Sequence, residues 1–268
     1  MKKYKNVVVV GCSFSASDDI FDFVNPGETY GEIIANHFGA KYYDLAKGGT
    51  SNQRMNRVIL NWCSKNKDKF NDTLIIFGMT ALDRFEMWNN KSNYWWSSYL
   101  GLYEPLYHRD TDWQRRLGVK PHEIPPSELV IDWPIQQRKN YFKNFYNENA
   151  VFLQAIHIIV GLQSFFKVNN IDSVFFDASI ESIGEYYKWC DENEFGEQYS
   201  NKLLWDSLIK TEYWYQHPKY RGFIDLTRNN VDMRVDQKKW PGDLHPNVKA
   251  HKYWAKCLME FIDEKINT

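Results

Sequence analysis

Short apolar runs alternate with amphipathic stretches through the first part of the chain. Lys5–Val10 is rich in valine and ends at Gly11, a pattern typical of a buried strand that leads into a loop. Lys41–Leu45 and Thr73–Phe77 predict two more strands, the second of them closed by Gly78. The first third of the chain therefore supplies three strands.

Helical patterns lie between these strands. Tyr30–Phe38 carries apolar residues at helical spacing and is followed by Gly39, which can end a helix. Ser51 can cap a second helix that runs from Asn52 to about Ser64. Strands that alternate with helices indicate an α/β fold, in which helices cover a parallel sheet.

The second half of the chain continues the pattern less regularly. Residues 141–168 predict a long helix, and Asp172–Asp177 predicts a strand. Residues 181–211 are mixed and expected to be helical in parts. Phe223–Leu226 is read as a last short strand, and Val248–Ile266 as an amphipathic C-terminal helix.

Residues 88–140 interrupt this alternation. The segment holds five tryptophans, several tyrosines and a proline-rich run at 121–126, with little periodicity. We expect an aromatic-rich insertion over the sheet, because the segment is too irregular to have a core of its own. Residues 1–268 are therefore predicted to form one domain with this insertion.

Composition excludes several classes of protein. Hydrophobic residues make up 43% and charged residues 25%, a globular balance. The formal net charge of -1 gives no reason to expect a nucleic-acid partner. No apolar run is expected to approach the roughly 20 residues that cross a bilayer.

The N-terminal valines are too few for a signal peptide, which needs about 7–15 apolar residues. The 4 cysteines are far apart and form no CxxC pair, so neither a zinc module nor a disulfide framework is expected. Reduced thiols and the absence of an export signal predict a cytoplasmic location, or a phage-encoded, virion-associated protein.

Three polar loops could carry chemistry. Ser13 follows the first strand and Gly11-Cys12, where helix amides could stabilise an oxyanion, although a simple helix cap would also explain it. Gly48-Gly49 gives a backbone that a ligand can approach closely, or only a tight turn. Asp243 and His245 lie two residues apart in a loop before the last helix, as a base and its orienting carboxylate would, or in an ordinary surface turn.

Taken in order, these loops resemble the blocks of the SGNH (GDSL-type) hydrolase family. Gly11-Cys12-Ser13 matches the Gly-Asp-Ser block, and Gly49 matches the glycine of the second block. Gly78-Met79-Thr80-Ala81 stands where the family has Gly-x-Asn-Asp. Asp243-Leu244-His245-Pro246 corresponds to the final Asp-x-x-His block.

The resemblance implies a flavodoxin-like, three-layer α/β/α fold and a serine esterase that needs no metal or organic cofactor. It implies Ser13 as nucleophile, His245 as base and Asp243 as the orienting acid. The oxyanion hole would use the amides of Ser13 and Gly49 and the side chain of Thr80, with Asn52 as an alternative donor. The partner would be a small-molecule or carbohydrate ester.

Three departures from the family pattern bear on activity. Cys12 replaces an aspartate that is not part of the triad, and is read as a small buried residue. Thr80 replaces an asparagine, and loss of one oxyanion donor can cost about 10²–10³ in rate. Asp243 is one residue closer to the histidine than in the family, which leaves Asp232 or Asp236 as alternative partners, or a dyad.

Several alternatives stay open at this point. Arg84 and Glu86 could line the site or form a surface ion pair, and His251 is read as a residue of a helix surface. The aromatic insertion could stack on sugar rings, which makes acetylated carbohydrate the first substrate to consider. The rival functions are an acyltransferase on the same site and a non-catalytic binding or structural protein with this fold.

Overall fold

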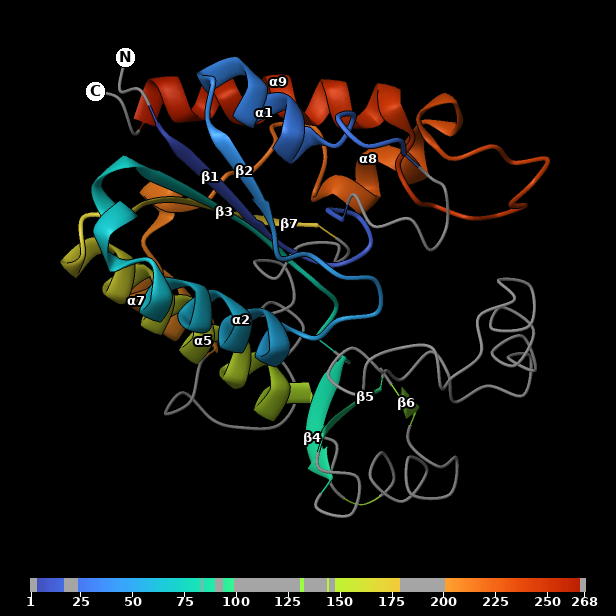
Figure 1. The fold of residues 1–268 in the computed structure, drawn as a ribbon. Coiled ribbons are helices and arrows are strands. Elements are labelled where there is room, and N and C mark those ends of the chain that lie inside the picture. The colour runs from blue at the N-terminus through green and yellow to red at the C-terminus, as the bar shows by residue number, and fades with distance from the viewer. Residues whose placement is uncertain are drawn as a thin grey trace.

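A four-stranded parallel sheet forms the centre of the computed structural model (Figure 1). The structure describes residues 4–16, 24–82, 84–89, 94–98, 131–132, 144, 148–178 and 201–265. The strands are β1 (Asn6–Val10), β2 (Lys41–Asp44), β3 (Thr73–Met79) and β7 (Asp172–Asp177), in the order β2-β1-β3-β7. This order matches the first four strands of a flavodoxin-like sheet.

Helices cover both faces of the sheet. α1 (Tyr30–Phe38), α8 (Phe223–Asn229) and α9 (Val248–Lys265) lie on one face, and α2 (Asn52–Lys65), α5 (Glu148–Val168) and α7 (Asn201–Leu208) lie on the other (Figure 1). Short 3-10 helices span Lys67–Asp72, Thr211–Tyr213 and Val231–Met233. The predicted three-layer α/β/α fold is confirmed.

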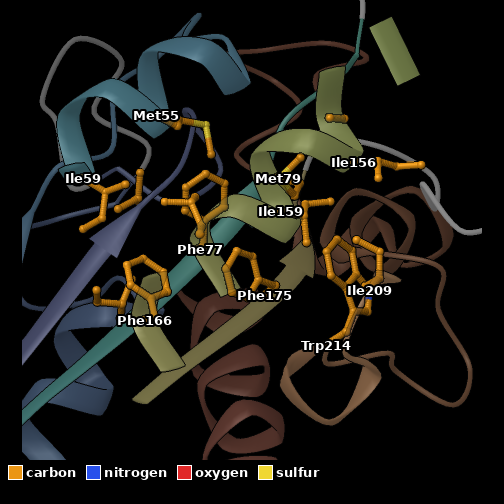
Figure 2. Close-up of a cluster of buried hydrophobic side chains, with 14 of the residues drawn as sticks. Met55, Ile59, Phe77, Met79, Ile156, Ile159, Phe166, Phe175, Ile209 and Trp214 are labelled. Carbon is orange, nitrogen blue, oxygen red and sulfur yellow. The ribbon is translucent and has the colours of Figure 1, made fainter. Parts of the chain in front are cut away.

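Alternation along the strands explains why there are two cores. In β1, Val8 and Val10 face the α2 and α5 side, while Val7 and Val9 face the α1 and α9 side. Figure 2 shows the first core, where Met55 and Ile59 of α2 gather with Phe77, Phe166 and Phe175. Burial on both faces accounts for the uninterrupted apolar run of β1.

The ends of the first two helices follow local rules. Thr29 accepts from the Glu32 N–H while the Glu32 carboxylate accepts from the Thr29 N–H, a capping box that fixes the start of α1. Gly39 ends α1 in the left-handed region at φ 62. Ser51 accepts from the Arg54 N–H and begins α2, as predicted.

Two predicted strand boundaries need correction. Gly78 lies inside β3 and does not close it, and a Cβ there would lie 2.9 Å from the Phe176 ring. Phe223–Leu226 is part of helix α8, with buried residues at positions 223, 226 and 227, which is helical spacing. Beyond β7 the chain pairs through Trp214, which forms an isolated parallel bridge with Phe175.

Helix α5 corrects the expectation about apolar length. Within it, Ala150–Val168 is long and apolar enough to cross a membrane by length and composition alone. Its buried face belongs to the first core, as Figure 2 shows for Ile156 and Ile159. Packing against the sheet is the environment of a core helix, so the composition of this segment is explained without a membrane.

The aromatic-rich segment at 88–140 lies largely outside the described residues. The strands that are described in and just before this segment form a small second, three-stranded sheet. In it β4 (Phe85–Asn89) pairs antiparallel with β5 (Tyr94–Ser98), and β5 pairs parallel with β6 (Ile131–Asp132). Residues 141–143, 145–147 and 181–200 of the predicted helical regions also lie outside the described part. The single-domain organisation stays a prediction.

Candidate active site

Ser13 lies in a tight turn directly after β1. The Cys12 carbonyl accepts from the N–H groups of Ser15 and Ala16, at 2.9 and 3.1 Å, which closes the turn. Cys12 and Phe14 are buried while Ser13 between them is half-buried, so the turn presents the serine hydroxyl at the carboxyl edge of the sheet. This is the edge at which open α/β sheets place ligands.

His245 reaches this serine from the loop before α9. Its Nε2 lies 2.7 Å from the Ser13 Oγ, although the two residues are 232 positions apart in the chain. The ring also packs against Phe14, with 4.8 Å between ring centroids and 31° between planes. Phe14 therefore fixes one face of the imidazole, a role that its position next to Ser13 did not signal in the sequence.

Asp243 holds the other side of the imidazole. Its Oδ1 lies 2.6 Å from His245 Nδ1 and also accepts from the His245 backbone N–H at 2.8 Å. Because an ionised carboxylate only accepts, Nδ1 carries the hydrogen and Nε2 is left to accept from the Ser13 hydroxyl. The short Asp-x-His spacing is thus sufficient for the carboxylate of Asp243 to reach both the backbone N–H and the ring of His245.

The charge state of Asp243 suits this arrangement. Burial raises the pKa of this carboxyl, but the hydrogen bonds and charge of His245 outweigh burial and hold the pKa below its ordinary value. The two alternative carboxylates are engaged elsewhere: Asp232 pairs with Lys249, and Asp236 accepts from the Lys238 N–H at 2.9 Å. Of the three carboxylates, Asp243 is therefore the one that contacts the His245 ring.

The two loops predicted to supply the oxyanion hole are tied together by Asn52. Its Nδ2 donates to the Thr80 carbonyl and its Oδ1 accepts from the Thr80 N–H, each at 3.0 Å. Gly49 precedes this tie in the left-handed region at φ 69 and is exposed. The side chain of Asn52 thus links the loop after β2 to the loop after β3.

The Thr80 side chain is fully buried and already accepts a hydrogen bond. The residue is 0% exposed, and its Oγ1 accepts from Arg84 Nη1 at 2.9 Å. The donors of the oxyanion hole, Ser13, Gly49 and Thr80 or Asn52, stay a prediction.

Arg84 and Glu86 do not form the surface pair suggested by their spacing. Glu86 accepts from Arg57 at 3.1 and 3.2 Å, and its side chain is only 4% exposed. Burial raises the pKa of Glu86, partly offset by the charges of Arg57 and Arg54. The pair joins α2 to the start of β4 and has a structural role.

His251 is buried, which corrects its expected place on a helix surface. Its Nδ1 accepts from the Tyr30 N–H at 3.2 Å and so satisfies the first free amide of α1. Desolvation, with a smaller effect of the nearby His245, lowers the pKa of His251 to about 3. The residue is a neutral acceptor that joins α9 to α1.

No group of three or more metal-ligating side chains occurs among the described residues. Cys12, Cys63 and Cys257 are free thiols, and Cys190 lies outside the described part.

Comparison with models of known families and with curated protein sequences gave no match. Among solved structures the chain is similar to the psychrotrophic esterase EstA from Pseudoalteromonas sp., at 8% identity and a TM-score of 0.49, covering 98% of this chain and 100% of that one. It is similar to the acetyl xylan esterase Est2A from the rumen bacterium Butyrivibrio proteoclasticus, at 12% identity and a TM-score of 0.49, covering 98% and 65%. A member of the lipolytic protein G-D-S-L family from Veillonella parvula matches at 13% identity and a TM-score of 0.40, covering 95% and 96%. Two of these three similar structures are thus named as esterases, and the third as a lipolytic protein of the G-D-S-L type.

Proposed function

We propose that the protein is a serine esterase of the SGNH type that hydrolyses O-acyl esters through an acyl-Ser13 intermediate. One observation carries the proposal: Ser13, His245 and Asp243 form a continuous hydrogen-bonded line, with 2.7 and 2.6 Å between successive polar atoms. A nucleophile, a base and an orienting carboxylate within hydrogen-bond reach are the parts that acyl transfer requires.

In the acylation step, the Ser13 Oγ attacks the ester carbonyl carbon while His245 Nε2 takes the hydroxyl proton. The carbonyl π electrons move to oxygen, which gives a tetrahedral oxyanion. Asp243 stabilises the imidazolium that forms and keeps its ring in place. Collapse of the intermediate breaks the bond to the alcohol oxygen, which receives the proton from His245 and leaves as the free alcohol.

Deacylation repeats these steps with water. His245 removes a proton from water, the hydroxide oxygen attacks the acyl carbon, and the tetrahedral intermediate collapses with release of the carboxylic acid. Ser13 Oγ recovers its proton from His245. In both halves the amides of Ser13 and Gly49 are the proposed donors to the oxyanion, and the Asn52 tie holds the second loop in position.

Acetylated carbohydrate is the first substrate to test. The proposal for the alcohol rests on the tryptophans and tyrosines of residues 88–140, since such rings can stack on sugars. An acetylated polysaccharide would therefore be compared with a simple aryl acetate.

Labelling with a fluorophosphonate probe tests the mechanism without knowledge of the substrate. We expect the wild type to be labelled at Ser13, and Ser13→Ala to be unlabelled. His245→Ala should be labelled at least about 10³-fold more slowly, because the base is lost. His37→Ala is the matched control, since His37 lies in the last turn of α1 and should not affect labelling.

Absence of labelling in the folded wild type would overturn the proposal. Labelling of His245→Ala at the wild-type rate would also contradict it, because the serine would then react without its base. Circular dichroism of each variant checks that the fold is retained.

A further inference from the structure

One side chain holds together the loop that carries Asp243. The Gln237 Nε2 donates to the Val235 carbonyl at 3.0 Å and to the Asp243 carbonyl at 2.8 Å. Its Oε1 accepts from the Gly242 N–H at 3.0 Å. The amide therefore bridges the two arms of the loop with three hydrogen bonds, all of them to backbone groups.

The orientation of this amide is fixed by its partners. Two carbonyls surround Nε2 and one N–H faces Oε1, so the reverse orientation would place acceptor against acceptor and donor against donor. Both hydrogens of Nε2 are used. Gln237 adds these bonds to the few backbone hydrogen bonds of the loop around Gly242, where φ is +77.

The two catalytic side chains of the loop have different supports. The His245 carbonyl accepts from the Val235 N–H at 2.9 Å, and the Leu244 carbonyl accepts from the Thr227 hydroxyl at 2.6 Å. The peptide of Asp243 is held instead by Gln237 and by the bond of its own N–H to the Trp240 carbonyl at 3.2 Å. Gln237 thus acts on the acid more directly than on the base.

We propose that Gln237 is a positioning residue that holds the Asp243 carboxylate in line with His245. The inference rests on the proposed function of this site and extends it to a residue that no motif marks. Asp243 accepts two hydrogen bonds from a residue only two positions away, a geometry that tolerates little rotation of its peptide. Release of the Asp243 carbonyl would let the carboxylate turn away from Nδ1.

Two substitutions separate the loss of the bridge from the loss of side-chain volume. Gln237→Glu keeps the length and an acceptor for Gly242 but cannot donate to the two carbonyls. Gln237→Ala removes all three hydrogen bonds. We expect the rate of fluorophosphonate labelling at Ser13 to fall about 10–100-fold in both, in the range that a misplacement of about 1 Å produces. Gln216→Ala, at an exposed position, is the matched control.

A double-mutant cycle distinguishes positioning from general destabilisation. If Gln237 acts through Asp243, then Gln237→Ala should slow labelling much less in an Asp243→Ala background than in the wild type. With an ester substrate, kcat should fall while KM stays within about twofold. Equal losses in both backgrounds would refute the inference.

A spectroscopic measurement tests the inference independently of activity. The proton between His245 Nδ1 and Asp243 Oδ1 lies in a short hydrogen bond and should give a far-downfield ¹H NMR signal. We expect the signal in the wild type and in Gln216→Ala, and its loss or marked upfield shift in Gln237→Glu. An unchanged signal in Gln237→Glu would overturn the positioning role even if Ser13 reacts, whereas failure of labelling in the wild type would refute only the esterase proposal.

Discussion

Replacing Gly11 by alanine should disable the site although Gly11 has no functional group. A Cβ at this position would lie 2.2 Å from the Oγ and 2.5 Å from the Cβ of Ser15. The Ser15 hydroxyl would have to move by about 1.2 Å to reach an ordinary contact of 3.4 Å. Ser15 is 0% exposed, so its hydroxyl cannot move out into solvent without a shift of the surrounding residues.

The displacement would act on Ser13 through the turn. The Ser15 N–H donates to the Cys12 carbonyl, so a shift of Ser15 would also move the peptide that leads into Ser13, the proposed nucleophile. Overpacking of this kind costs about 1–3 kcal/mol of folding free energy. A shift of about 1 Å at Ser13 can lower the rate by about 10²-fold, because the 2.7 Å bond to His245 is lost.

The assay combines fluorophosphonate labelling with urea unfolding. Gly161→Ala is the control: Gly161 lies in α5 with nothing within 4 Å of an added Cβ, and this change should stabilise the protein by about 0.5–1 kcal/mol. Adding Ser15→Gly to Gly11→Ala removes both clashing atoms and should restore most of the labelling. Wild-type labelling of Gly11→Ala alone would refute the reasoning.

Three further outcomes are expected. Burial depresses the pKa of His251 to about 3, so the stability that the neutral residue contributes is complete above its ordinary pKa of 6.5 and is lost as the pH falls. Between pH 6 and 4 this residue should lower the free energy of unfolding of the wild type by about 1.4 kcal/mol per pH unit, and His251→Gln should lack that decrease. The pKa of Asp243 is also lowered, so the difference in unfolding temperature between the wild type and Asp243→Asn should be present above about pH 4 and shrink below it. Asn52→Ala removes two buried hydrogen bonds to the Thr80 backbone and should cost about 1–3 kcal/mol in urea unfolding, with slower labelling of Ser13; an unchanged midpoint would contradict the tie between the loops.

Elements with a strong pattern could be predicted from the sequence because one physical effect dominates each of them. The valines of β1 are buried on both faces, and Gly39 supplies the left-handed conformation that ends α1. The assignment failed at Phe223–Leu226, where four residues fit a strand or one turn of helix equally well. Tertiary packing decided that case.

In the candidate site, too, some features could be predicted from the sequence and others could not. Ser13 and His245 could be placed at one sheet edge from their positions after a strand and before a helix. The contacts of Asp243 could not be derived, because the choice among three carboxylates depends on the shape of one loop. His251 and Gln237 were missed for a related reason: each bonds to backbone groups, and such contacts leave no pattern in the sequence.

The bond between Ser13 and His245 joins positions 232 residues apart. During synthesis the proposed nucleophile emerges early, yet its contact with His245 cannot form until the loop before α9 has been made. The reactivity proposed for Ser13 therefore depends on this long-range contact, and activity-based labelling during refolding would time its formation. The rate at which labelling appears would thus report the rate of a folding step.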